Sequence, residues 1–172
     1  VPAFIERSAD IKDAVTKNLT KESKVKVTVT GYVGNIRISL SGDITGHMEI
    51  PSSWGTILLD LCGHTFTSNY QEGAVILTGD HIEGASVIIS NEGAQEIVVD
   101  GIYTTNPGRI NGCSGSPAIS ADDISSNSLS IGSDVIITGG AGESSTDGAG
   151  GDGGAAITNL LDVFVQDNAA VV

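Results

Sequence analysis

The 172-residue sequence predicts an all-β fold, namely a single-stranded right-handed parallel β-helix (solenoid) with an N-terminal capping α-helix. Three observations favour it: many short β-branched segments bounded by turn residues, an aromatic content of only 4%, and related segments that recur along the chain. The 23 glycines against four prolines fit glycine-rich turns between such segments. A β-sandwich is the alternative, because many short strands with regular turns predict that fold too.

A helix is expected near the N-terminus, where apolar residues recur at helical spacing, at Ile11, Ala14, Val15 and Leu19. Ser8 is the expected N-cap, because a serine hydroxyl can accept a hydrogen bond from the first turn. We therefore assign residues 1–24 to a capping helix and residues 25–172 to the coils of a β-helix. Both belong to a single domain, for which a fragment of a longer protein is one interpretation.

Short strands are expected after the helix, over 25–30, 35–40, 56–61, 74–77, 85–90, 96–100, 128–131, 134–138, 155–158 and 162–165. Three related segments place Ile76, Ile119 and Ile157 in equivalent positions, 43 and 38 residues apart. A period near 40 residues predicts stacked units, each of which buries its apolar side against the next.

The segment TILLDL, residues 56–61, has the alternation of a strand with one buried face. Its inward residues are expected to be Ile57, Leu59 and Leu61, and its outward residues Leu58 and Asp60.

The charge is unevenly distributed along the chain. Residues 1–37 contain seven Lys and Arg and four acids, a local charge of +3, whereas residues 38–172 contain Arg109 and 17 acids, a local charge of −16. So acidic a surface repels phosphate backbones, which argues against nucleic-acid binding. No apolar run approaches the roughly 18 residues of a membrane-spanning helix, so membrane insertion is not expected. A signal peptide is absent or removed.

The run VTGYVGNIRISLSGDITGHMEIPSSWGTILLDLCGHTFTS resembles a recurrent segment of bacterial cell-surface proteins with right-handed β-helix repeats. In that family a D-L-x-x-A-L helix precedes T-V-T-L-T-G-D-I and then I-P-S-G-x-T-V-T-L-D-L-N-G-H-T-I-T. The corresponding parts here are the helix from Asp10 to Leu19, ISLSGDIT and IPSSWGTILLDLCGHTFT, with the Gly-rich CSGSPAI and ITGGAGESSTDGAGGDGGAAI as coil corners. Cys62 stands where the family usually has Asn.

The resemblance implies a non-catalytic structural or adhesion module of a bacterial surface protein. We expect it to be extracellular or at the cell surface, in contact with glycans or other surface proteins. A self-assembling fibre or appendage subunit is one alternative, and a polysaccharide lyase or hydrolase on a β-helix is another. Carboxylates for an enzyme could come from Asp80, Glu83, Asp122 and Asp123. Catalysis is disfavoured because Arg109 is the only Lys or Arg after residue 37, and no catalytic residue is assigned.

The motif Cys62-Gly63-His64 raises two questions: whether it binds a metal, and whether Cys62 forms a disulfide bond. A metal would need further ligands, with His47, His81 and Cys113 as the nearest candidates, and the paired spacings typical of zinc are missing. A strand-to-turn corner is therefore preferred. Cys62 and Cys113, 51 residues apart, are disulfide candidates if they fall on adjacent coils, and two buried free thiols are equally consistent with the sequence.

Two further sites are weighed near the C-terminus. Asp147 and Asp152 could share a Ca²⁺ ion on a Gly-rich loop, although no cofactor is expected and a protruding loop explains the composition. The last residues form an apolar run that would leave a strand edge unprotected. The predicted assembly edge, for coaxial homo-assembly, is Val163, Val165, Val171 and Val172.

Overall fold

The computed structural model of the chain describes residues 3–30, 36–79, 86–122, 128–143, 150–160 and 162–172. Within these ranges the chain forms one α-helix, α1 (Ala3–Thr16), two short 3-10 turns (Glu22–Lys24 and Ser52–Trp54) and seventeen strands. Because α1 begins at Ala3, Ser8 lies inside the helix and is not its N-cap, so that expectation is wrong.

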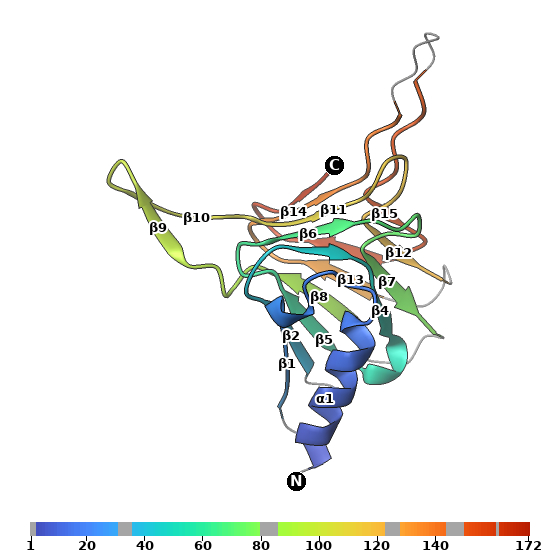
Figure 1. Cartoon of the computed structure of the whole chain (residues 1–172). Helices are drawn as coiled ribbons and strands as arrows, with labels where there is room; N and C mark the ends of the chain where they lie inside the picture. Colours follow the sequence, from blue (N-terminus) through green and yellow to red (C-terminus); the bar gives the residue numbers. More distant parts are fainter. Residues whose placement is uncertain (1–2, 31–35, 80–85, 123–127, 144–149, 161) are drawn as a thin grey trace.

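The strands form three larger sheets and one separate hairpin (Figure 1). Sheet 1 has the spatial order β1 (Val25–Val29), β2 (Ile36–Leu40), β5 (Ile57–Asp60), β8 (Ser86–Ser90), β13 (Ser128–Ile131) and β16 (Asp162–Val165). Sheet 2 has the order β3 (Ile44–Gly46), β6 (Thr65–Ser68), β11 (Gly108–Asn111), β14 (Val135–Thr138) and β17 (Ala170–Val171). Sheet 3 has the order β4 (Met48–Pro51), β7 (Val75–Thr78), β12 (Ile119–Ala121) and β15 (Ile157–Thr158). The hairpin pairs β9 (Glu96–Val99) with β10 (Ile102–Thr105).

This arrangement corrects the expected fold class. In its described residues the chain has several separate sheets of mostly parallel strands and one helix, and the expectation of a single right-handed β-helix solenoid is wrong. Two of the pairings, β1 with β2 and β9 with β10, are antiparallel. The alternative of a β-sandwich is not met either, because sandwiches are built from antiparallel sheets and the remaining pairings here are parallel.

Sheet 1 shows why a fixed period was misleading. Its inward row of residues runs through Ile36, Ile57, Val87, Leu129 and Val163, which face one another across neighbouring strands. The steps between them are 21, 30, 42 and 34 residues, so the chain returns to this sheet after segments of unequal length. The spacing near 40 residues reflects long connections and not a constant structural unit.

The inward alternation of TILLDL is confirmed. Ile57, Leu59 and Leu61 are each at most 1% exposed and belong to the apolar core, whereas Leu58 is only half-buried on the opposite face. Asp60 lies on the outward alternation but is nevertheless 0% exposed, because a later turn of the chain covers it.

The expected equivalence of three isoleucines holds for two of them. Ile119 faces Ile157 across the pair β12–β15, but on the other side it faces Val75, while Ile76 faces Ser120. A shift of one residue along a strand moves a side chain to the other face of the sheet. Ile76 therefore belongs to the outer face of sheet 3, where it takes part in the candidate site.

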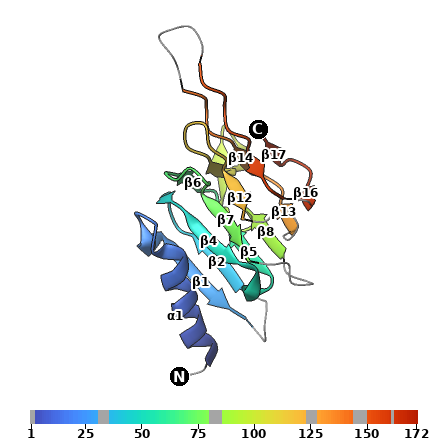
Figure 2. The ribbon, with the colours of Figure 1, turned by 90° about the vertical axis from the view of Figure 1, so that its right-hand side faces the viewer.

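Helix α1 lies across one end of the sheets, and β15, β16 and β17 are the last strands at the opposite end (Figure 2). The helix packs against β1 and β4 and buries Ile11 and Val15 in the core. Beyond the helix, Leu19 forms an isolated antiparallel bridge with Gly46. The sheets are therefore covered at the α1 end by a segment of their own chain.

Candidate functional site

A cleft of about 380 Å³ lies on the outer face of sheet 3. Its lining is mainly polar and comprises Gln71, Glu72, Ile76, Ser120, Ala121, Asp122, Thr158 and Asn159. These residues come from three successive strands of the sheet and from the segments that flank them, so residues separated by almost 90 positions in the sequence meet at one site. Small-molecule sites in proteins typically have volumes of roughly 300–1,000 Å³.

The floor of the cleft is set by strand register. Ile76, Ser120 and Thr158 lie side by side on β7, β12 and β15, in a row that begins at Glu49 of β4. Ile76 is only 4% exposed although it points away from the core, because the segment before β7 folds over it. Ser120 holds that segment by donating its Oγ hydrogen to the backbone carbonyl of Glu72. The floor thus has two hydroxyl groups, those of Ser120 and Thr158, beside one largely covered apolar side chain.

Two polar side chains at the rim are held by the backbone. Asp122 accepts a hydrogen bond from the Gly79 amide at Oδ2, at 3.2 Å. Asn159 has a left-handed backbone with φ of 61°, which asparagine tolerates, and its Nδ2 donates to the Ala121 carbonyl at 3.2 Å. These contacts fix polar groups around the opening before any ligand binds, which reduces the entropy lost on binding.

Two carboxylates, Glu72 and Asp122, line this same cleft. Of the acids considered from the sequence, Asp122 is placed at the site, whereas Asp80, Glu83 and Asp123 lie outside the described residues. Glu72 was missed by the sequence reasoning because it lies in a turn whose position over sheet 3 depends on the contact with Ser120, 48 residues later.

A second cleft, of about 320 Å³, lies on the outer face of sheet 1. It is lined by Ile88, Ser90, Asn91, Glu92, Gly132, Ser133, Asp134 and Gln166. Asn91 is buried and uses its side chain structurally: its Oδ1 accepts from the Gly63 amide and its Nδ2 donates to the Asn106 carbonyl at 2.9 Å. Of these two clefts the one on sheet 3 is the larger, and it gathers residues from three strands, so it is taken as the candidate site.

Next to this second cleft lies a buried carboxylate, Asp60. Its oxygens accept hydrogen bonds from the backbone amides of Cys62, at 3.0 Å, and Gly93, at 2.9 Å, and from the guanidinium of Arg37. Arg37 also lies 3.9 Å from the carboxylate of Glu92. The described partners account for the charge and the acceptor capacity of Asp60, so this group stabilises the corner and is not assigned to catalysis.

Cys62-Gly63 forms the centre of a tight turn, as the preferred interpretation of this motif predicted. Both residues have positive φ, 51° and 78°, and the His64 amide donates to the Leu61 carbonyl at 2.9 Å. A turn with two positive φ values is of type I′, for which Asn-Gly is the favoured pair. The Asn of the resembled family suits this position, and Cys62 occupies it with a backbone that L-residues other than Asn and Asp rarely adopt.

The two cysteines are both free. Cys62 follows β5 at the corner between sheets 1 and 2, whereas Cys113 follows β11 at the corner between sheets 2 and 3. The Cys62 thiol donates to the Asp60 carbonyl at 3.7 Å, and the Cys113 thiol donates to the Tyr70 carbonyl at 3.3 Å. The different corners explain why the structure does not join the two candidates, since a disulfide requires Cα atoms within about 7 Å.

Burial, followed by the negative charge of Asp60, raises the pKa of the Cys62 thiol above its ordinary value. In the variant Cys113→Ser, iodoacetamide should therefore label folded protein more slowly than urea-unfolded protein at pH 8.5, with the folded profile displaced to higher pH. Because folding raises this pKa, the stability contributed by the protonated thiol is complete below the unfolded pKa and is lost as the pH rises through the folded one. Coincident folded and unfolded profiles would contradict this, and intact mass with and without reductant checks that the unmodified chain has no disulfide.

No group of three or more His, Cys, Asp or Glu side chains that could hold a metal ion occurs in the described part of the chain. His64 Nδ1 lies 3.7 Å from Asp43 on the surface, and the ring of His47 stacks on Tyr70 with centroids 4.2 Å apart. His81 and the calcium candidate Asp147 lie outside the described residues, and Asp152 is exposed on the Gly-rich excursion between β14 and β15.

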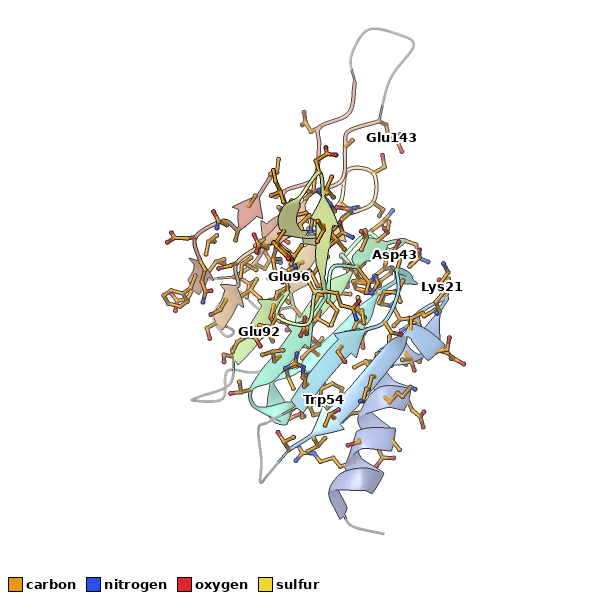
Figure 3. All side chains as sticks on the ribbon, turned by 90° about the vertical axis from the view of Figure 1, so that its left-hand side faces the viewer. Lys21, Asp43, Trp54, Glu92, Glu96 and Glu143 are labelled. Carbon is orange, nitrogen blue, oxygen red and sulfur yellow. The ribbon has the colours of Figure 1, made fainter. Side chains whose placement is uncertain are left out.

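The hairpin β9–β10 projects from the body of the molecule (Figure 1). Figure 3 shows Glu92 near its base and Glu96 on the hairpin itself. Its apolar side chains are exposed, and they comprise Ile97, Val98, Val99, Ile102 and Tyr103. Asp100 and Gly101 at its tip have φ of 50° and 78°, a type I′ turn. The sequence reasoning assigned β9 but missed β10, although Asp-Gly between β-branched residues is a recognised hairpin signal.

The predicted assembly edge lies at the exposed ends of sheets 1 and 2. Val163, Val165, Val171 and Val172 are 36, 50, 42 and 73% exposed, respectively. Within the described ranges, no helix is both long enough and apolar enough to cross a membrane.

Comparison with known proteins finds no matching family model, no matching curated protein and no matching solved structure. The resemblance to bacterial surface repeat proteins therefore stays a prediction from the sequence.

Proposed function

We propose that this chain is a non-catalytic adhesion module of a bacterial surface protein that binds an uncharged glycan in the cleft on sheet 3. The observation that carries the proposal is the cleft itself, whose lining gathers hydroxyl, amide and carboxylate groups from three neighbouring strands and the segments beside them. Such groups can donate hydrogen bonds to sugar hydroxyls and accept hydrogen bonds from them.

The charge of the molecule supports an uncharged ligand. Glu72 and Asp122 make the cleft acidic, and no Lys or Arg is among the residues that line it. With the chain at −13 overall, anionic glycans and nucleic acids would be repelled on approach. An extracellular location accords with this proposal, because glycans of this kind are displayed outside cells.

The test is a glycan array of neutral and acidic saccharides, followed by titration calorimetry with the best neutral ligand. We expect Asp122→Ala to weaken binding at least about tenfold, because a charge-assisted hydrogen bond to a ligand contributes roughly 1.5–3 kcal/mol. Asp152→Ala is the matched control, since it removes an exposed acid outside the cleft and should leave the affinity unchanged. Thermal unfolding of both variants checks that the loss of the Gly79 contact has not unfolded the chain. Absence of any neutral ligand, or undiminished binding by Asp122→Ala, would contradict the proposal.

A second candidate function follows from the two carboxylates in one cleft. Hydrolysis of a glycosidic bond generally uses a pair of Asp or Glu side chains, one as acid and the other as base or nucleophile. Release of reducing sugar from a bound glycan, abolished by Glu72→Gln and also by Asp122→Asn, would establish an enzyme in place of a binding module. Binding without release in the unmodified chain supports the adhesion module.

A further inference from the structure

The turn before β7 forms one wall of the cleft on sheet 3. The wall consists of Gln71 and Glu72, which are exposed and line the cleft. The next residues, Gly73 and Ala74, are buried. The Ala74 amide donates to the Ala118 carbonyl at 2.8 Å, which fixes the end of the turn next to the start of β12. The position of the wall therefore depends on what holds the beginning of the turn.

Tyr70 is the residue at which the turn begins. Its carbonyl accepts hydrogen bonds from the Gly73 amide at 3.1 Å and from the Cys113 thiol at 3.3 Å, and its amide donates to Ser68 Oγ at 3.1 Å. Gly73 has a positive φ of 120°, and a Cβ added there would lie only 2.9 Å from the Ala118 carbonyl oxygen. The backbone from Tyr70 to Gly73 is thus tightly specified, so a displacement of Tyr70 would move the wall with it.

His47 supports Tyr70 from the neighbouring corner, between β3 and β4. The two rings are stacked, with centroids 4.2 Å apart and an interplanar angle of 22°. The backbone of His47 is held in place, because its amide donates to the Asn18 carbonyl at 3.3 Å. Gly46, just before it, has a φ of 136° and no room for a Cβ beside that same carbonyl. Because this corner is packed against the segment that follows α1, the ring of His47 is a firm base for the ring of Tyr70.

The stack is the contact through which His47 acts on the turn. Its Nδ1 is buried and has no hydrogen-bond partner among the described residues, so this atom does not hold Tyr70. Stacked aromatic pairs contribute to stability beyond the area that they bury, and this contribution comes from the rings. A phenylalanine ring should therefore support Tyr70 as well as the imidazole does, and it would bury no unpaired nitrogen.

We propose that His47 is a positioning residue for the cleft on sheet 3, which holds the wall in place through its stack on Tyr70. His47 itself is not among the residues that line the cleft. Tyr70 is 38% exposed, so without the stack its ring can move into water, and the wall moves with it. A wall that is already ordered loses less entropy when a ligand binds. The effect on binding rests on the proposed function, whereas the position of the turn can be measured without a ligand.

Amide hydrogen exchange of the ligand-free chain, measured by NMR, tests the position of the turn. The Gly73 amide reports on this turn, and the His64 amide, which donates to the Leu61 carbonyl at 2.9 Å, reports on a comparable turn at another corner. In His47→Ala, and in His47→Leu, which keeps an apolar side chain without a ring, the Gly73 amide should exchange about tenfold faster because a stacked pair is lost. The His64 amide should keep its rate, and His47→Phe should restore that of Gly73. Equal acceleration of both amides, an unchanged rate at Gly73, or no rescue by His47→Phe would overturn the proposal.

Titration calorimetry with the neutral saccharide that binds best on the array tests the consequence for the cleft. The dissociation constant should rise about fivefold in His47→Ala and return to within about twofold in His47→Phe. His64→Ala is the matched control, because it removes an imidazole that lies near Asp43 outside the cleft, and it should change neither the exchange of Gly73 nor the affinity. If the unmodified chain binds no neutral saccharide, the proposed function fails, while the exchange rates still decide the role of His47. If the saccharide binds the unmodified chain and His47→Ala equally well, the positioning role fails, while the proposed function stands.

Discussion

Replacement of Asp60 by Ala is expected to lower the free energy of unfolding by about 3–4 kcal/mol. The carboxylate is 0% exposed and accepts hydrogen bonds from the amides of Cys62 and Gly93 and from Arg37. Removing it leaves both amides without their acceptor and leaves Arg37 without its closest charge partner. Alanine would also leave a gap at this corner. The corner is tightly packed, since a Cβ added to Gly93 would come within 2.6 Å of Cys62 Sγ, so we expect that the neighbouring groups cannot move in to close the gap.

Chemical denaturation at neutral pH measures the effect, and Asp43→Ala is the matched control. Asp43 also accepts from a backbone amide, that of Thr65 at 2.9 Å, and it also lies near a basic side chain, His64. Its side chain is 69% exposed, so water replaces the lost contacts and the cost should stay below about 1 kcal/mol. Equal losses in the two variants would show that burial of Asp60 does not govern the stability of this corner.

The local features of the chain were predictable from its sequence. Ile57, Leu59 and Leu61 alternate in a β-branched setting, and the structure buries all three. The turn at Cys62-Gly63 was predicted for the same reason, because glycine after a strand marks a bend and Gly63 adopts the positive φ that the bend requires. These features depend on residues within a few positions of one another.

What the sequence did not reveal depends on contacts between distant segments. Asp60 is on the outward alternation of β5, and its burial results from Gly93, 33 residues later. The partition of strands among separate sheets likewise depends on which segments pair, and the unequal connections hide that pairing from any fixed period. Apolar and polar residues alternate along a strand in the same way whichever sheet the strand joins. This alternation therefore could not distinguish the observed fold class from the expected one.

The candidate site was hidden for a related reason. The sequence alignment of Ile76 with Ile119 is shifted by one residue, because Ile119 faces Val75 in the structure. This one-residue shift in register places Ile76 on the floor of a cleft and not in the core. No local motif links Glu72 to Asp122, because register and the Ser120 hydrogen bond bring them together. Residues that meet on neighbouring strands lie far apart in the sequence, so they form no short motif that could be recognised there.

The largest core effect is expected for Phe66, the one fully buried aromatic side chain in the described part of the chain. Phe66 lies in the inward row of sheet 2, where it faces Ile44 on one side and Ile110 on the other. Phe66→Ala should lower the free energy of unfolding by about 3–5 kcal/mol, because the apolar contacts are lost and the rigid strands on both sides keep the cavity from closing. Phe66→Leu, which fills much of the same volume, should cost less than half as much.

The inward row of sheet 2 also contains an exposed residue whose replacement can be compared with that of Phe66. Beyond Ile110 it continues through Ile137 to Val171, which is 42% exposed at the last layer. Val171→Ala should cost less than about 1 kcal/mol in dilute protein, since water already contacts this side chain. Chemical denaturation of dilute protein measures both penalties, and the penalty of Phe66→Ala should be the larger because Phe66 is fully buried. A large penalty for Val171→Ala in dilute protein would contradict the exposure of this layer, and a small one for Phe66→Ala would contradict the rigidity of the core around it.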